Sequence, residues 1–137
     1  MRLLLIGYGR MGRLVEQFAA EHQCEVAAIV DEGQRIADVT APFDVAIDFS
    51  TAEAVRENVA AVAALGRSIV IGTTGWQVHE ADVRAIAQQH NIGVLASANF
   101  SLGLNAFLLV VEEAARRFAP YSDYGAWIHE AHHIKKK

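Results

Sequence analysis

The stretch of residues 3–12 reads LLLIGYGRMG, and the fold predicted for the whole chain rests on it. Four apolar residues lead directly into the pattern G-x-G-x-x-G. Apolar residues then recur at the spacing of one helix face, as Leu14, Val15, Phe18 and Ala19. A second apolar run, residues 26–30, ends in Asp31, nineteen positions after the last glycine. This order predicts a strand, a glycine loop, a helix and a second strand that closes on an acid.

Each part of that pattern suits the binding of a dinucleotide. Gly7 permits a tight turn, Gly9 lets a pyrophosphate approach the backbone, and Gly12 allows close packing of helix on strand. The helix N-terminus offers unpaired N–H groups and the positive end of its dipole to the phosphates. Asp31 can accept hydrogen bonds from the ribose hydroxyls of an adenosine. The alternative is a tight turn in an α/β domain that binds no phosphate, but the presence of all four parts favours the dinucleotide.

The rest of the chain continues the alternation of strands and helices. We expect strands over residues 44–49, 68–71, 92–96 and 123–130, and helices that end near Gly66, His90 and Phe118. Ser50 and Glu53 have the spacing of a capping box before the first of these helices. Parallel strands with helices on both faces give an α/β fold, a Rossmann-like doubly wound sheet. The loops at the carboxyl ends of the strands are expected to carry the chemistry.

The composition of the chain argues against several classes of protein. The 137 residues carry a net charge of −4 and show no basic stripe before the last three lysines, so nucleic acid is not an expected partner. Cys24 is the single cysteine, which excludes a disulfide framework. No apolar run is long enough to cross a membrane, and the run before Gly7 is too short for a signal peptide. We expect a cytoplasmic protein.

Three further groups of residues could bind a ligand or take part in catalysis. The loop Gly72, Thr73, Thr74 and the loop Ser97, Ala98, Asn99, Phe100 could hold a nicotinamide, or could simply turn and cap helices. His132 and His133 with Lys136 could supply acid–base groups and hold a carboxylate, or form a frayed basic terminus. A His–His metal site would need Glu130, and no other ligand has convincing spacing, so no metal is expected.

The segments GYGRMGR, AIDFST, IGTTGW, SANFSLGLN and EAHHIKK resemble the 4-hydroxy-tetrahydrodipicolinate reductase (dihydrodipicolinate reductase) family of the bacterial lysine pathway. The resemblance covers essentially the whole chain, and E-x-H-H-x-x-K is its most specific motif. It implies that His132 exchanges a proton, that Lys136 donates one and that His133 contacts a small dicarboxylate substrate. It also implies that the two nicotinamide-side loops contact the cofactor. The cofactor-binding residues expected in all are Gly7, Tyr8, Gly9, Arg10, Met11, Gly12, Asp31, Gly72, Thr73, Thr74, Ser97, Ala98, Asn99 and Phe100.

Two departures from the family pattern qualify these expectations. Members continue after the lysine motif with D-A-P-S-G-T and a substrate and oligomerisation domain, whereas this chain stops at Lys137. We therefore expect residues 1–130 to form the dinucleotide domain and 131–137 to begin a substrate domain, in a fragment or a natural short form. The family's homotetramer is then in doubt. The second departure is Asp31-Glu32, where some members carry a basic residue, so NADH is expected in preference to NADPH.

Three functions remain open. The first is NAD(P)H-dependent reduction of 4-hydroxy-tetrahydrodipicolinate to tetrahydrodipicolinate, with cofactor binding retained and turnover negligible in this chain alone. The second is an NAD(H)-binding module without catalytic activity. The third is a dehydrogenase that acts on another small substrate. A reading frame that continues with D-A-P-S-G-T after Lys137 would favour the reductase over the module, and NADH binding and turnover by this chain are the most informative measurements.

Overall fold

A computed structural model describes residues 1–129 of the chain. The chain divides into two compact units, residues 1–100 and a second unit that begins at Ser101. Each is described by itself. The expected division into residues 1–130 and 131–137 depends on residues beyond His129 and stays a prediction.

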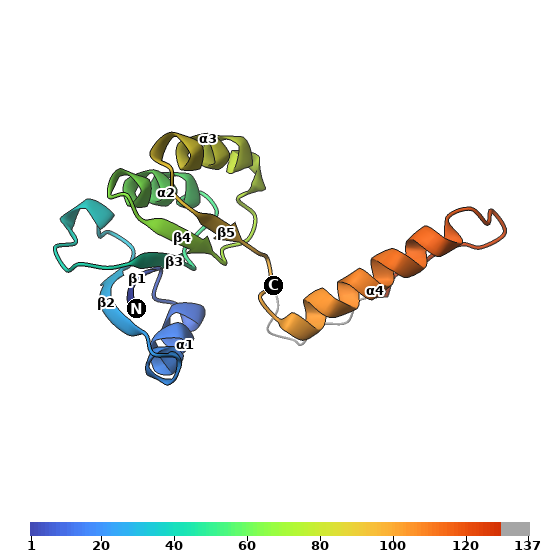
Figure 1. The fold of residues 1–137 in the computed structure, drawn as a ribbon, viewed down its shortest axis with the longest axis horizontal. Coiled ribbons are helices and arrows are strands. Elements are labelled where there is room, and N and C mark those ends of the chain that lie inside the picture. Colours follow the sequence, from blue (N-terminus) through green and yellow to red (C-terminus); the bar gives the residue numbers. More distant parts are fainter. Residues whose placement is uncertain (130–137) are drawn as a thin grey trace. The chain divides into compact units, whose positions relative to one another are not determined.

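The first unit is built on a sheet of five parallel strands (Figure 1). They are β1 (Arg2–Ile6), β2 (Glu25–Val30), β3 (Val45–Asp48), β4 (Ser68–Ile71) and β5 (Val94–Ala96), in the order β2-β1-β3-β4-β5. The order of the strands reverses between β1 and β3, and ligands of open α/β sheets bind at such a point, beyond the carboxyl ends of the strands. The α/β fold predicted from the sequence is confirmed.

Helices cover both faces of this sheet (Figure 1). Helix α1 (Arg10–Ala19) lies on one face, over a core that includes Leu3 and Leu5. Helices α2 (Val55–Ala64) and α3 (Glu80–His90) lie on the other, over the larger core around Leu4 and Ile69. Alternate residues of β1 thus enter opposite cores, which explains why residues 3–6 of the strand are all apolar. Short 3-10 turns, η1 (Ala20–His22), η2 (Ile36–Asp38) and η3 (Gln77–His79), complete the connections.

Two local predictions on this unit are wrong. No capping box forms at Ser50 and Glu53, because α2 begins only at Val55 and its N-cap, Ala54, has no side-chain hydrogen bond. The hydroxyl of Ser50 instead donates to Asp48. Phe18, expected on the inner face of α1, is 42% exposed. The predicted stop at Gly66 is confirmed, since Gly66 follows the end of α2 with φ +64 and donates to Ala63.

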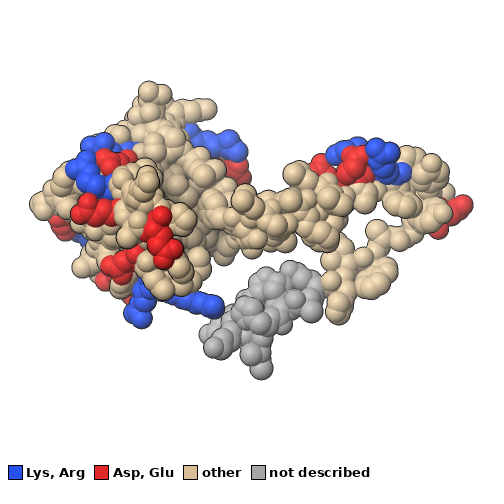
Figure 2. All heavy atoms as spheres, turned by 60° about the horizontal axis from the view of Figure 1, so that its bottom comes forward, with Lys and Arg blue, Asp and Glu red and all other residues tan. Residues whose placement is uncertain are grey.

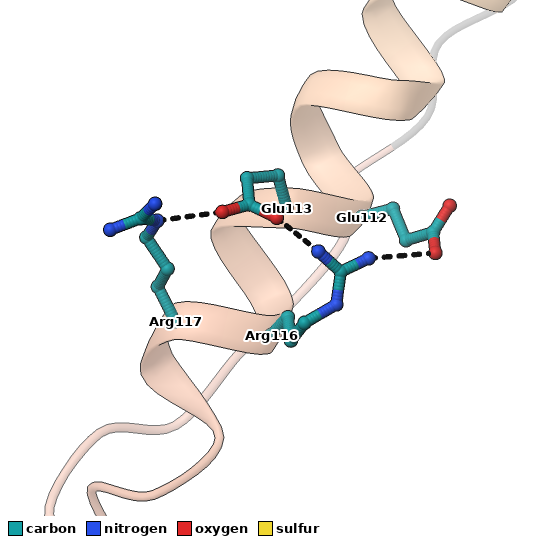
Figure 3. Close-up of polar contacts among 4 residues, drawn as sticks. All are labelled: Glu112, Glu113, Arg116 and Arg117. Atoms are coloured by element: carbon teal, nitrogen blue, oxygen red, sulfur yellow. Dashed lines mark hydrogen bonds and ion pairs between the residues drawn. The ribbon is translucent and has the colours of Figure 1, made fainter.

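The second unit consists mainly of helix α4 (Leu102–Phe118). Ser101 caps it, accepting from the N–H of Leu104 at 3.3 Å. Its first part is apolar, and its charges gather near its C-terminal end (Figure 2). There Arg116 pairs with Glu112 and Glu113, and Arg117 pairs with Glu113 (Figure 3). Within residues 1–129, no helix combines the length and apolar character needed to cross a membrane.

The sixth strand expected over residues 123–130 is wrong for the described part of that range. Residues 124–129 carry no regular structure, and Asp123 belongs to a turn. A strand forms only where a neighbour accepts its backbone hydrogen bonds, and no strand in residues 1–129 pairs with this segment. The ring of Tyr124 instead lies against that of Phe118 at the end of α4, with the ring centres 5.3 Å apart and the planes tilted by 58°. The apolar residues of this segment predicted a buried strand, but an apolar pattern does not show whether a neighbouring strand is available for hydrogen bonding.

Candidate dinucleotide site

The glycine loop joins the end of β1 to α1, and its three glycines differ in the space around them. A Cβ on Gly7, which has φ +85, would lie 2.4 Å from the carbonyl oxygen of Phe49. A Cβ on Gly12 would lie 2.3 Å from the carbonyl oxygen of Gly7. Around Gly9 nothing lies within 4 Å of such an atom. The first and last glycines therefore serve close packing, while Gly9 leaves open space at the N-terminus of α1.

Asp31 lies at the end of β2 and is bonded to this loop. Its Oδ1 accepts from the backbone N–H of Tyr8 at 3.2 Å. Its own N–H donates to the side-chain oxygen of Gln34 at 2.8 Å. The carboxylate is exposed and held beside the loop, with Oδ1 engaged by the protein. The structure thus brings together the glycine loop and the acid that the sequence placed nineteen residues apart.

The first turn of α1 carries Arg10 and Arg13 and no acidic residue. Arg10 and Arg13 line a cavity of about 540 Å³ together with Gly9, Leu14 and Gln17. The guanidinium of Arg13 lies 5.5 Å from the centre of the Tyr8 ring, and the Tyr8 hydroxyl donates to Glu16. That hydrogen bond raises the pKa of Tyr8. Cations beside a helix N-terminus are unfavourable for an isolated helix and favourable when an anion binds there.

The ends of β4 and β5 form a second part of the site. A Cβ on Gly72 would lie 2.0 Å from the ring of Phe49, so this glycine is required for packing. Thr73 is buried, whereas Thr74 is exposed. Thr73, Ser97 and Ala98 contribute to a cavity of about 550 Å³, whose other walls are mainly η3, α3 and β5. Ser97 also makes a turn with Asn99, accepting from the Asn99 N–H at 3.2 Å. Both expected nicotinamide-side loops therefore reach the same rim.

A buried carboxylate, missed as a site residue by the sequence analysis, lies at this rim. Asp48 ends β3 and has no exposed surface. Its two oxygens accept hydrogen bonds from Ser50, Asn58 and Thr73. The signal available in the sequence was an acid at the end of an apolar run, followed by two hydroxyl residues. That signal shows where a polar group lies but not which distant groups it binds.

The residues expected to act on substrate lie outside the described part of the chain. They are His132, His133 and Lys136. Glu130, which was considered only as a metal ligand, also lies outside the described residues. Within residues 1–129 there is no group of three or more His, Cys, Asp or Glu side chains that could hold a metal ion. The site described here therefore contains only residues that are expected to bind the cofactor.

The family model for the N-terminus of dihydrodipicolinate reductase matches residues 1–100, the whole of the first unit. The chain belongs to the dihydrodipicolinate reductase family. The 4-hydroxy-tetrahydrodipicolinate reductase of Christiangramia forsetii is 32% identical over 137 residues, which cover 99% of this chain and 57% of that protein. The enzyme of the same name from Methanoculleus marisnigri is 42% identical over 94 residues, 69% of this chain and 36% of that protein. The chain thus spans about half the length, or less, of these dihydrodipicolinate reductases.

Solved structures with little sequence similarity share the fold. Scyllo-inositol dehydrogenase from Lactobacillus casei superposes with a TM-score of 0.63 at 14% identity, over 83% of this chain and 41% of that chain. An NAD-binding protein from Listeria innocua gives a TM-score of 0.56 at 17% identity, over 72% of this chain and 34% of that chain. At such identities the likeness shows only that this chain has a Rossmann-like fold.

Proposed function

We propose that the first unit binds NADH, and NADPH more weakly, as the cofactor-binding part of a 4-hydroxy-tetrahydrodipicolinate reductase. The observation that carries the proposal is the contrast among the three glycines. Gly7 and Gly12 have no room for a side chain, while the space over Gly9 is open and faces the N-terminus of α1. A pyrophosphate would fit in that open space, where the unpaired N–H groups of the helix N-terminus could bind it.

The remaining residues of the site suit the same ligand. Arg10 and Arg13 supply positive charge beside the proposed phosphate position. Asp31 has Oδ1 engaged by Tyr8, and the other carboxylate oxygen is proposed to accept from the adenosine ribose. Glu32 is exposed next to it and would repel a 2′-phosphate. Thr73, Ser97 and Ala98 are proposed to face the nicotinamide half from the rim cavity.

When bound, the dihydronicotinamide supplies a hydride. On the family resemblance, His132 or Lys136 gives the proton that completes reduction of a cyclic dicarboxylate substrate. His133 and Lys136 would hold a carboxylate. The product, tetrahydrodipicolinate, belongs to lysine and diaminopimelate biosynthesis. The resemblance also leads us to propose a cytoplasmic setting and a homotetramer, whose mass light scattering would measure.

Calorimetric titration with NADH and NADPH tests the proposal directly. We expect saturable binding of one cofactor per chain, with the tighter constant for NADH. Absence of binding by either would contradict it. A coupled assay with 4-hydroxy-tetrahydrodipicolinate then measures turnover. Oxidation of NADH only in the presence of substrate would show a reductase. Binding without oxidation is expected both of a reductase fragment and of a binding module, and a reading frame that continues with D-A-P-S-G-T would favour the fragment.

A further inference from the structure

The buried carboxylate of Asp48 is fully occupied by hydrogen bonds. Oδ1 lies 2.9 Å from the backbone nitrogen of Ser50, 2.7 Å from the Ser50 hydroxyl oxygen and 2.8 Å from Oγ1 of Thr73. Oδ2 lies 2.9 Å from Nδ2 of Asn58. None of these partners carries a charge. Burying a carboxylate is costly, and here several donors offset that cost.

The geometry settles which atom gives each proton. A backbone N–H can only donate, so Oδ1 of Asp48 must act as an acceptor toward Ser50. The hydroxyl of Thr73 lies at hydrogen-bond distance from this same oxygen and from the backbone oxygen of Asp48, at 3.4 Å, which is also an acceptor. The single proton of Thr73 therefore points into the protein. Toward any other partner, Oγ1 of Thr73 has only lone pairs to offer.

Thr73 also lines the cavity of about 550 Å³ whose other walls are mainly η3, α3 and β5. We propose that Asp48 is a positioning residue which makes Thr73 a hydrogen-bond acceptor in this cavity, so that the site selects a ligand group that donates. The inference rests on the proposed function and deepens it. In a nicotinamide cofactor the group concerned is the amide N–H of the carboxamide, because its carbonyl oxygen cannot donate to Thr73.

A cofactor analogue isolates that one group. Reduced 3-acetylpyridine adenine dinucleotide has a methyl ketone in place of the carboxamide, so it keeps the carbonyl oxygen and lacks the N–H donors. Its adenosine and pyrophosphate are those of NADH. We expect NADH to bind about tenfold more tightly than this analogue, because the analogue leaves the oxygen of Thr73 without a partner.

Variants assign that preference to Thr73 and Asp48. Thr73→Val removes the acceptor at nearly constant volume and should bring the ratio of the two dissociation constants close to one. Thr40→Val, on an exposed threonine elsewhere in the unit, is the matched control and should leave the ratio unchanged. Asp48→Ala frees the Thr73 hydroxyl to rotate and should also abolish the preference. Circular dichroism and thermal unfolding check that each variant is folded.

The conservative change Asp48→Asn distinguishes positioning from stability. Its amide oxygen should take the place of Oδ1, because the N–H of Ser50 requires an acceptor there. The hydrogen bond from Thr73 then survives, while the new amide nitrogen opposes Nδ2 of Asn58. We expect a lower melting temperature with the tenfold preference retained. This variant keeps the proposal testable even if Asp48→Ala does not fold.

These measurements distinguish failure of the proposed cofactor binding from failure of the role given to Thr73 and Asp48. Binding of neither cofactor by the unaltered chain removes the proposed function and this inference with it. Equal binding of NADH and the analogue leaves the dinucleotide site in place and overturns the inference alone. A preference that survives Thr73→Val, or that a folded Asp48→Asn loses, also overturns it.

Discussion

The backbone N–H of Tyr8 lies 3.2 Å from Oδ1 of Asp31, so the glycine loop and the end of β2 are joined by a direct hydrogen bond. Asp31 therefore has two parts to play in the proposed site. One oxygen holds the loop that would bind the pyrophosphate, and the other is proposed to meet the ribose. Substitutions that separate these two parts give the first prediction.

Asp31→Ala should weaken NADH binding by about tenfold or more, since it removes hydrogen bonds to a charged acceptor and the restraint on the loop. It should also reduce the preference for NADH over NADPH. Asp31→Asn is the matched variant, because its carbonyl oxygen can still accept from Tyr8 while the charge is gone. It should reduce the preference to a similar extent, with a smaller effect on NADH binding. Calorimetry with both cofactors measures this, and NADPH binding to the unaltered chain as tightly as NADH would be the contrary result.

Gly9→Val should abolish NADH binding and leave the fold intact. Gly9 has φ −76, which a side chain tolerates, and an added Cβ meets nothing within 4 Å. The side chain would occupy the space proposed for the pyrophosphate. Gly125→Val, at a glycine with equally open surroundings in the second unit, is the control. Undiminished affinity in a folded Gly9→Val chain would count against the phosphate-loop assignment.

Gly12→Ala should instead destabilise the first unit. Its Cβ would lie 2.3 Å from the carbonyl oxygen of Gly7, so helix α1 must shift from the end of β1. Overpacking of this kind costs about 1–3 kcal/mol, and each kcal/mol lowers the melting temperature of a small domain by about 4–8 °C. Gly103→Ala, also in a helix, has its closest contact at 3.9 Å and should not lower it. Equal melting temperatures for the two variants would show that the loop can relax.

The stability of the chain should fall with pH below about 4, in part through Asp44. The side chain and backbone N–H of Arg2 hydrogen-bond this carboxylate and lower its pKa from 3.8 to about 2. A depressed pKa means that the stabilisation is complete above the unfolded value and disappears as the pH falls toward the folded value. In urea unfolding, the difference between the chain and Asp44→Asn should therefore shrink from pH 5 to pH 2. A difference in the free energy of unfolding that stays constant over that range would show that Asp44 is not a source of the pH dependence.

Asp44 also shows which contacts cannot be predicted from the sequence alone. The alternation of apolar runs and glycine loops was sufficient to predict the parallel sheet and the loop of residues 7–12, because backbone period and chain reversal are local properties. Nothing local marks Arg2 and Asp44 as partners. Their contact depends on β1 and β3 lying side by side, an arrangement that the strand order establishes.

The sequence by itself determined the fold class, the family and the chemical identity of the glycine loop, since these follow from short patterns of residues in chain order. Only the tertiary structure decided that Ser50 binds Asp48 rather than capping α2, and that residues 123–129 form no strand. It alone brought Thr73 to Asp48 across twenty-five residues. The physical reason is that a buried polar group bonds whichever donors packing places within about 3 Å of it, and packing joins elements that are distant in the chain.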